Sequence, residues 1–183
     1  PVDRRHAITV VCGVRTLNNR FPQAQISRLV KRILNQTHLR SGYAFIPEAD
    51  PAVACELARQ SDLKVVCTSS DAETVDAARE SLMAAGMYGT RVVFHRGSLF
   101  SLKYPDYFAN LIVLLPRALQ AMDTQSASSV YDALRPAGGI AWIGLGPGGP
   151  SALDIEGAVS QVLAANDALQ RNANSMSIIR GKL

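Results

Sequence analysis

The sequence predicts a doubly wound α/β fold, with one mainly parallel sheet of six or seven strands covered by helices on both faces. Short apolar runs alternate along the chain with segments whose apolar residues recur every three to four positions. The runs are apolar throughout rather than at every second residue, which is typical of strands buried on both faces of a parallel sheet. With 183 residues, 48% of them hydrophobic and 19% charged, the chain has the size and composition of one such domain.

The local pattern places the elements in order. Apolar residues within 26–34 follow helical spacing and predict a helix that starts near Pro22. Asp50 followed by Pro51 is a typical helix start. The segment Ser70-Asp71-Ala72-Glu73 has capping-box spacing at the start of another helix, and Asp71 is expected to cap a helix there. The expected strands are 43–46, 63–68, 91–95, 109–115, 140–144 and 175–179, and the expected helices after the first are 52–60, 71–85, 117–122, 126–134 and 155–169.

Strands and helices in this alternation define a Rossmann-like domain, which we expect to cover residues 22–183. Residues 1–21 have no clear period and are expected to form an arm or linker. In such sheets a ligand crevice lies at the carboxyl ends of the strands, near the point where the strand order reverses. The loops after the first four strands are therefore the segments where a functional site is expected.

Composition excludes some classes of protein. The longest apolar runs fall far short of the roughly 20 residues that a membrane span needs, so no span is expected. Cys12, Cys55 and Cys67 are odd in number and match no zinc spacing, and we expect buried thiols rather than a disulfide framework. The chain begins without methionine, and we expect it to be a segment of a longer protein, whose compartment and oligomeric state the residues leave open.

The positive charge of the chain is concentrated near its start. Residues 1–40 carry eight basic residues against one acidic residue, whereas residues 41–170 carry eight basic and fourteen acidic residues. A basic flank is one signature of nucleic-acid binding, but aromatic residues are not interleaved with these arginines. The pattern favours a solvated or domain-docking face over a nucleic-acid partner.

Other candidate chemistry is sparse. His6, His38 and His95 have no spacing that would bring metal ligands together, and His95 is expected to be partly buried in a packing role. The glycine-rich segment 144–149 lacks the Lys-Ser/Thr pair of a phosphate-binding loop and is expected to be a turn. The aromatic residues of 104–108 are expected in the core rather than around a ligand.

Several local signatures resemble one enzyme family. The segment Leu134-Arg135-Pro136-Ala137-Gly138-Gly139 is similar to an L-R-P-G-G turn, residues 107–113 resemble the fourth strand of that family, and 71–97 has its acidic start, alanine-rich helix and glycine-punctuated strand. Residues 26–145 as a whole resemble a class I S-adenosylmethionine-dependent methyltransferase. The terminal residues 178–183 resemble the junction that joins methyltransferase-like domains to quinoprotein-type β-propellers in some bacterial proteins, so the resemblance implies other domains of a parent protein as partners.

The resemblance also marks where S-adenosylmethionine would bind, and those positions differ from the family pattern. A G-x-G-x-G loop normally follows the first strand, and the matching residues here are Pro47, Glu48, Ala49, Asp50 and Pro51. Two prolines there remove backbone donors. An acidic residue that binds the ribose normally ends the second strand, where this chain has Ser69, with Asp71 two residues later. The acidic residue that normally meets the adenine after the third strand is replaced by Gly97 and Ser98.

Three functions are consistent with these replacements. The first is a non-catalytic methyltransferase-like domain that has lost S-adenosylmethionine binding and acts as a structural or interaction module. The second is an active methyltransferase with an atypical pocket built from Glu48, Asp50, Ser69 and Asp71. The segment Leu114-Leu115-Pro116 holds no base, but methyl transfer chiefly needs positioning and desolvation, so the missing base does not exclude this function. The third is a binder of another nucleotide-like small molecule on the same fold.

Overall fold

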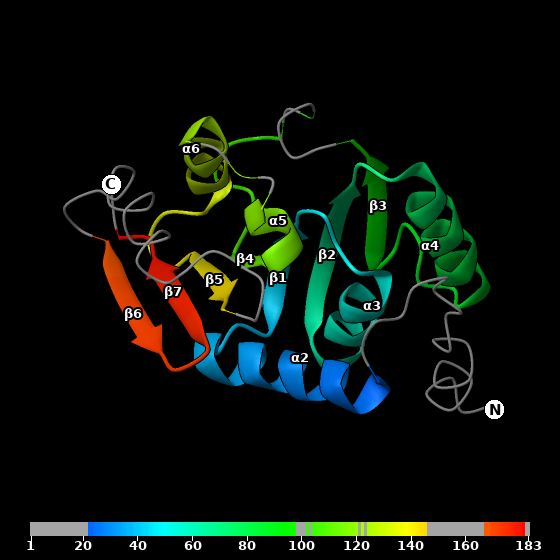
Figure 1. The fold of residues 1–183 in the computed structure, drawn as a ribbon, viewed down its shortest axis with the longest axis horizontal. Coiled ribbons are helices and arrows are strands. Elements are labelled where there is room, and N and C mark those ends of the chain that lie inside the picture. Colours follow the sequence, from blue (N-terminus) through cyan, green and yellow to red (C-terminus); the bar gives the residue numbers. More distant parts are fainter. Residues whose placement is uncertain are drawn as a thin grey trace.

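A computed structural model describes residues 22–97, 102, 104–120, 122, 124–145 and 167–181 of the chain. Its centre is a seven-stranded sheet in the order β3-β2-β1-β4-β5-β7-β6 (Figure 1). The strands are β1 (Ser41–Ile46), β2 (Asp62–Ser69), β3 (Val92–Arg96), β4 (Leu111–Leu114), β5 (Ile140–Gly144), β6 (Ala168–Asn172) and β7 (Ser175–Ile179). The described helices are α2 (Gln23–Thr37), α3 (Pro51–Gln60), α4 (Ala72–Ala84), α5 (Pro116–Gln120) and α6 (Thr124–Ala133).

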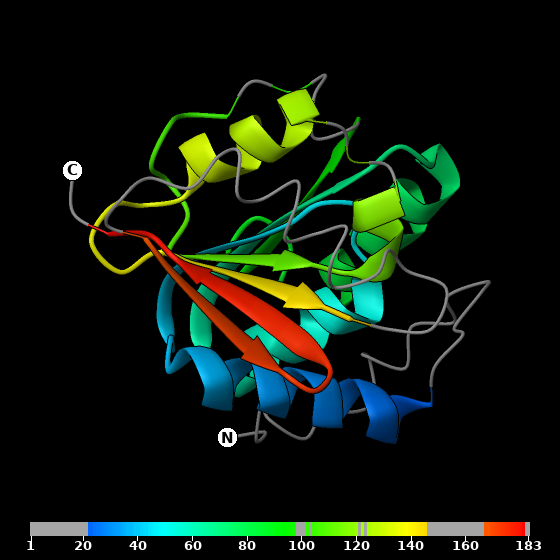
Figure 2. The same cartoon turned by 60° about the vertical axis from the view of Figure 1, so that its left-hand side comes forward.

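The sheet lies between two layers of helices, as the doubly wound class requires. Figure 2 shows α2 and α3 below the sheet and α5 and α6 above it. The two faces carry separate apolar clusters, one centred on Leu63, Phe94 and Trp142 and the other on Phe45 and Ile143. The expected Rossmann-like α/β fold is therefore confirmed, and the central strands β4 and β5 are buried on both faces.

Parallel pairing joins β1, β2, β3, β4 and β5, while β7 is antiparallel to its two neighbours. Gly42 brings β1 close to β4, because it has a φ of +100° and a Cβ built there would lie 2.3 Å from Asn110 Oδ1. That oxygen accepts a hydrogen bond from Tyr43 N at 3.0 Å. Glycine is therefore required at position 42, because a side chain there would collide with the Asn110 side chain that bonds the backbone of β1.

Helix α2 is fixed to the far half of the sheet by one polar side chain. Gln36 Oε1 accepts a hydrogen bond from Trp142 Nε1 at 2.7 Å and another from Ser175 Oγ at 3.0 Å. The three residues come from α2, β5 and β7, so a single half-buried amide joins α2 to the hairpin of β6 and β7. The Gln36 oxygen thus supplies the hydrogen-bond acceptor that the buried Trp142 indole and Ser175 hydroxyl each need.

The strand β6 differs from the sequence-based expectation. Residues 155–169 were expected to form a helix, but Leu169 lies in β6, which forms an antiparallel hairpin with β7. All five β6 residues are exposed. The strand therefore lacks the alternation of apolar and polar residues by which a half-buried strand is predicted from sequence. Residues 155–166, the N-terminal arm 1–21 and the glycine-rich residues 146–149 lie outside the described part of the chain.

The cysteine prediction was right in one case and wrong in another. Cys67 is a free, fully buried thiol, and burial raises its pKa well above the ordinary value. Cys55 is instead disulfide-bonded. Within the described residues, no group of three or more histidine, cysteine, aspartate or glutamate side chains is arranged to hold a metal ion. In the same residues, no helix combines the length and apolar character of a membrane span.

Candidate functional site

The reversal of strand order falls at β1, which pairs with β2 on one side and β4 on the other. Parallel strands end at the same edge of a sheet, so the loops after β1, β2, β3 and β4 meet there. Glu48 follows β1, Ser70 follows β2, and Arg117 lies in the first turn after β4. These three side chains meet at the switch point and define the candidate site.

Glu48 occupies the centre of this site. Its φ is +46°, a left-handed backbone conformation that glycine adopts more easily than glutamate. Its carboxylate accepts hydrogen bonds from Ser70 N at 3.2 and 3.3 Å and from Ser70 Oγ at 3.1 Å. Arg117 Nε lies 3.8 Å from Glu48 Oε2 across the switch point. The Glu48 side chain is 9% exposed.

The rest of the loop after β1 has few backbone donors to offer a ligand. Pro47 and Pro51 have no N–H, and Ala49 N donates to Thr68 O at 2.9 Å. Asp50 is the N-cap of α3, as predicted, and its Oδ1 accepts from Ala52 N at 2.8 Å. At most two of the five loop residues therefore have an amide available for a bound molecule.

The candidate residues after β2 and β3 are engaged in local structure. Ser69 is buried, and its Oγ accepts from Asp71 N at 3.2 Å. Asp71 caps α4, as predicted, through Glu73 N. Gly97 has a φ of +140° and its N–H donates to Ser69 O at 2.9 Å, which extends the pairing of β2 with β3. Ser98 lies outside the described residues.

The Asp71 carboxylate also responds to its neighbours. The hydrogen bond from the Thr74 hydroxyl is the largest cause that holds the pKa of Asp71 below its ordinary value, and Arg117 lowers it further. Arg117 thus lies beside the Glu48 carboxylate and also favours the charged form of Asp71. The structure brings together the loop after β1 and the start of α4 as the sequence predicted. The contacts are made by Ser70, which the sequence placed only at a helix start, and by Arg117, which no motif singled out.

A second group of polar side chains lies on the α5/α6 face of β2 and β3. Thr68 is fully buried, and its Oγ1 has no hydrogen-bond partner in the described part of the chain. Its neighbour in register on β3 is His95, whose Nδ1 lies 3.1 Å from Tyr104 Oη. Burial raises the pKa of Tyr104 to about 12, so its hydroxyl remains protonated. His95 is exposed, in contrast to the partly buried position expected from the sequence.

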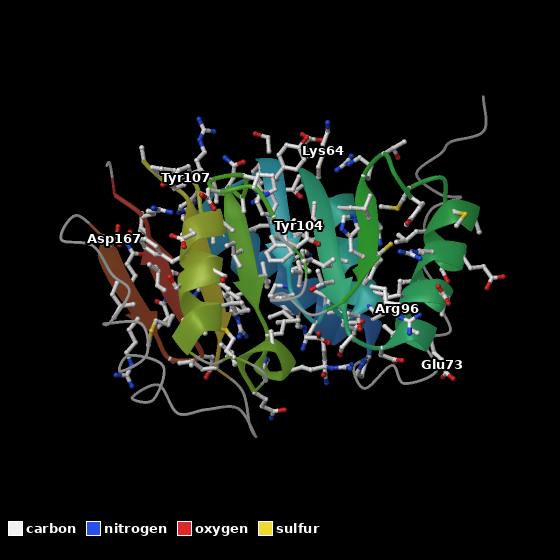
Figure 3. The ribbon with its side chains drawn as sticks, turned by 90° about the horizontal axis from the view of Figure 1, so that it is seen from above. Lys64, Glu73, Arg96, Tyr104, Tyr107 and Asp167 are labelled. Atoms are coloured by element: carbon white, nitrogen blue, oxygen red, sulfur yellow. The ribbon has the colours of Figure 1, made fainter. Side chains whose placement is uncertain are left out.

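Aromatic rings cover this face of the sheet. Tyr104 stacks between His95, at a centroid distance of 5.9 Å, and Phe108, at 5.5 Å, and it contacts Phe45 below. Figure 3 shows Tyr104 near the middle of the sheet, with Arg96 and Glu73 at one end of the strands and Lys64 and Tyr107 at the other. Tyr104 and Phe108 pack against the core, as predicted, whereas Tyr107 is 44% exposed.

Solved structures with a similar overall fold are known. A putative S-adenosyl-L-methionine-dependent methyltransferase from Methanococcus maripaludis superposes with a TM-score of 0.74 at 18% identity, covering 97% of this chain and 93% of that protein. The chain has the fold of S-adenosylmethionine-dependent methyltransferases. No protein-family model matches the sequence, and no curated protein sequence matches it significantly.

Two further structures show what proteins of this methyltransferase fold include. Magnesium protoporphyrin IX methyltransferase from Synechocystis PCC 6803, solved with bound S-adenosylmethionine, has a TM-score of 0.63 at 12% identity and covers 86% of this chain and 79% of its own. The [4+2]-cyclase SpnF has a TM-score of 0.65 at 17% identity and covers 79% of this chain and 58% of its own. At these identities the likeness concerns the fold.

Proposed function

We propose that this chain is a methyltransferase-fold domain that no longer binds S-adenosylmethionine and serves as a structural or interaction module, positioned by other domains of a larger parent protein. The observation that carries the proposal is the Glu48 carboxylate. It lies at the switch point, where a ligand of this fold would enter, and its hydrogen bonds go to Ser70 of the same chain. A carboxylate that already accepts hydrogen bonds within the protein gains little binding free energy from a ligand that must displace those bonds.

The remaining positions support the same proposal. The prolines at 47 and 51 and the engaged Ala49 amide reduce the backbone donors after β1. Ser69 supplies a hydroxyl already used by Asp71 N, where a carboxylate would accept both ribose hydroxyls. Losing a charge-assisted contact of that kind costs about 1.5–3 kcal/mol, and about 1.4 kcal/mol is tenfold in affinity. Two or three such losses would move a micromolar site to the millimolar range.

Calorimetric titration of the full chain with S-adenosylmethionine and S-adenosylhomocysteine tests the proposal. We expect no binding below about 1 mM, the range reached when two or three contacts are lost. An active methyltransferase titrated in the same buffer is the positive control. The Glu48→Gly variant, which removes the carboxylate from the switch point and accepts the left-handed backbone, identifies whether Glu48 itself excludes the cofactor. Sub-millimolar binding by the unmodified chain contradicts the proposal and favours an active enzyme with an atypical pocket.

One observation favours a second candidate function, the binding of a different small molecule. Thr68 Oγ1 is buried beside the His95–Tyr104 pair and has no hydrogen-bond partner among the residues that the structure describes. Buried hydroxyls are normally hydrogen-bonded, so an unpaired one beside a strand end is suited to a ligand's polar group. A thermal-stability screen of nucleosides and nucleotides, with Thr68→Val as the matched control, would support this function if a stabilising compound lost its effect in the variant.

A further inference from the structure

The outward face of α2 carries charge of one sign. Its charged residues are Arg28, Lys31 and Arg32, and all three are exposed. None of them forms an ion pair with any residue among those that the structure describes. Residues three and four apart share one side of a helix, so the three cations form a single basic stripe.

Basic side chains on the neighbouring helices are paired instead. Arg59 of α3 lies 2.9 Å from the Glu56 carboxylate. Arg79 of α4 donates to Phe94 O at 2.9 and 3.1 Å and lies 3.7 Å from Asp76. The basic stripe of α2 therefore differs from the other helical surfaces of this layer in having no acidic partner within its own helix.

The outward face of α4 carries the opposite charge. Glu73, Asp76 and Glu80 are exposed and recur at positions i, i+3 and i+7, which places them on one side of the helix. Met83 continues the same side and is 59% exposed, more than any other large apolar side chain of the described residues. With the capping Asp71 and the single Arg79, α4 carries a net charge of −3 against +3 for α2.

The two stripes cannot neutralise each other within one molecule. Figure 1 places α3 between α2 and α4, with α2 along the lower edge and α4 at the right-hand end of the sheet. We propose that α2 of one copy of this chain docks against α4 of a second copy. This is a head-to-tail interface between two different surfaces, so it repeats from copy to copy. It is independent of whether the crevice binds S-adenosylmethionine.

The spacing of the charges suits an antiparallel alignment of the two helices. Arg28 and Arg32 are separated by about 6 Å along the α2 axis, as are Asp76 and Glu80 along α4. In the register that sets Arg32 opposite Asp76, Arg28 lies opposite Glu80. Met83 then lies opposite the exposed Ala24 and Gln25, which adds an apolar contact at the end of the charged stripe.

Sedimentation velocity of the full chain over a range of concentrations tests the interface. We expect self-association at 20 mM salt and its loss at 500 mM, since screening shortens the reach of exposed charges. The variant Arg28→Glu/Lys31→Glu/Arg32→Glu and the variant Glu73→Lys/Asp76→Lys/Glu80→Lys should each be monomeric at 20 mM salt. An equimolar mixture of the two should associate again, because each variant supplies the charge that the other has lost.

A control separates the stripe from net charge alone. The variant Lys64→Glu/Arg96→Glu/Arg135→Glu changes the net charge by the same amount on exposed residues away from α2, and it should still associate. Circular dichroism of every variant verifies that it is folded. Wild-type chain that stays monomeric at 20 mM salt overturns the proposal, as does an α2 variant that associates like wild type or a mixture that stays monomeric.

Discussion

At the scale of single residues, the most informative feature is Glu48, which has the positive φ that glycine normally adopts. Glu48 keeps its left-handed backbone, and its carboxylate holds the loop after β1 against the end of β2 through Ser70. A left-handed conformation costs roughly 1–2 kcal/mol for a residue with a Cβ. The hydrogen bonds from Ser70 offset this cost. The same contacts therefore occupy the Glu48 carboxylate at the switch point and stabilise the loop after β1.

Two substitutions at Glu48 separate the backbone from the side chain. Glu48→Ala removes the acceptor of Ser70 N and Oγ but keeps a Cβ, and we expect it to lower the free energy of unfolding by about 1–3 kcal/mol. Glu48→Gly loses the same acceptor but relieves the backbone, so it should be about 1 kcal/mol more stable than Glu48→Ala. Urea denaturation of both variants measures the difference. Equal stabilities would show that the positive φ is not strained.

At the scale of elements, α3 and α4 both begin at the site with a side-chain cap. Asp50 caps α3 and Asp71 caps α4, and each was predicted from an acidic residue directly before a helical segment. Such local features can be found from sequence because donor and acceptor are two residues apart. The helix expected to reach Leu169 was wrong for the opposite reason, because the exposed strand β6 exists through its pairing with β7.

The cap of α4 should make stability depend on pH. The pKa of Asp71 in the folded state lies below its ordinary value of 3.8, chiefly because of Thr74. The charged cap therefore stabilises the fold above about pH 4, and this contribution is lost as the pH falls through the lower folded-state pKa. Asp71→Asn should be less stable than wild type at pH 7 and approach it at pH 3.

Chemical denaturation of wild type and Asp71→Asn at the two pH values measures this change. Thr74→Val should remove most of the pH-dependent part, because the Thr74 hydroxyl is the main cause of the lowered pKa. Glu80→Gln, on the exposed side of the same helix, is the matched control and should change little with pH. A constant difference between wild type and Asp71→Asn from pH 7 to pH 3 would contradict the assignment.

At the scale of the whole molecule, the buried Arg180 connects the end of β7 to α6. Arg180 is 4% exposed, and its Nη1 donates to Tyr131 O at 2.6 Å and Leu134 O at 2.8 Å. Its guanidinium lies 4.1 Å from the centroid of the Tyr131 ring and 4.8 Å from that of Tyr107. The end of β7 is thereby tied to α6 and to the turn before β4.

Truncation of this arginine should therefore destabilise the whole domain. We expect Arg180→Ala to lower the free energy of unfolding by about 2–4 kcal/mol, since two carbonyls lose their donor and two rings lose their cation. Arg180→Lys should lie between Ala and wild type, because lysine keeps the charge but not the planar fork. Urea denaturation measures both, with the exposed Arg135→Ala as control. A loss no larger than that of the control would contradict this role.

The sequence by itself determined the fold class, most strands and helices and the two helix caps. These follow from burial patterns and from contacts between residues close together in the chain. Only the tertiary structure decided that Glu48 binds Ser70, 22 residues away, and faces Arg117 across the switch point. It alone also showed that β6 is a strand, and that Arg180 binds the carbonyls of Leu134 and Tyr131, which are 46 and 49 residues away. Such pairings depend on which strand ends the closed sheet brings together, and a local pattern carries no information about that geometry.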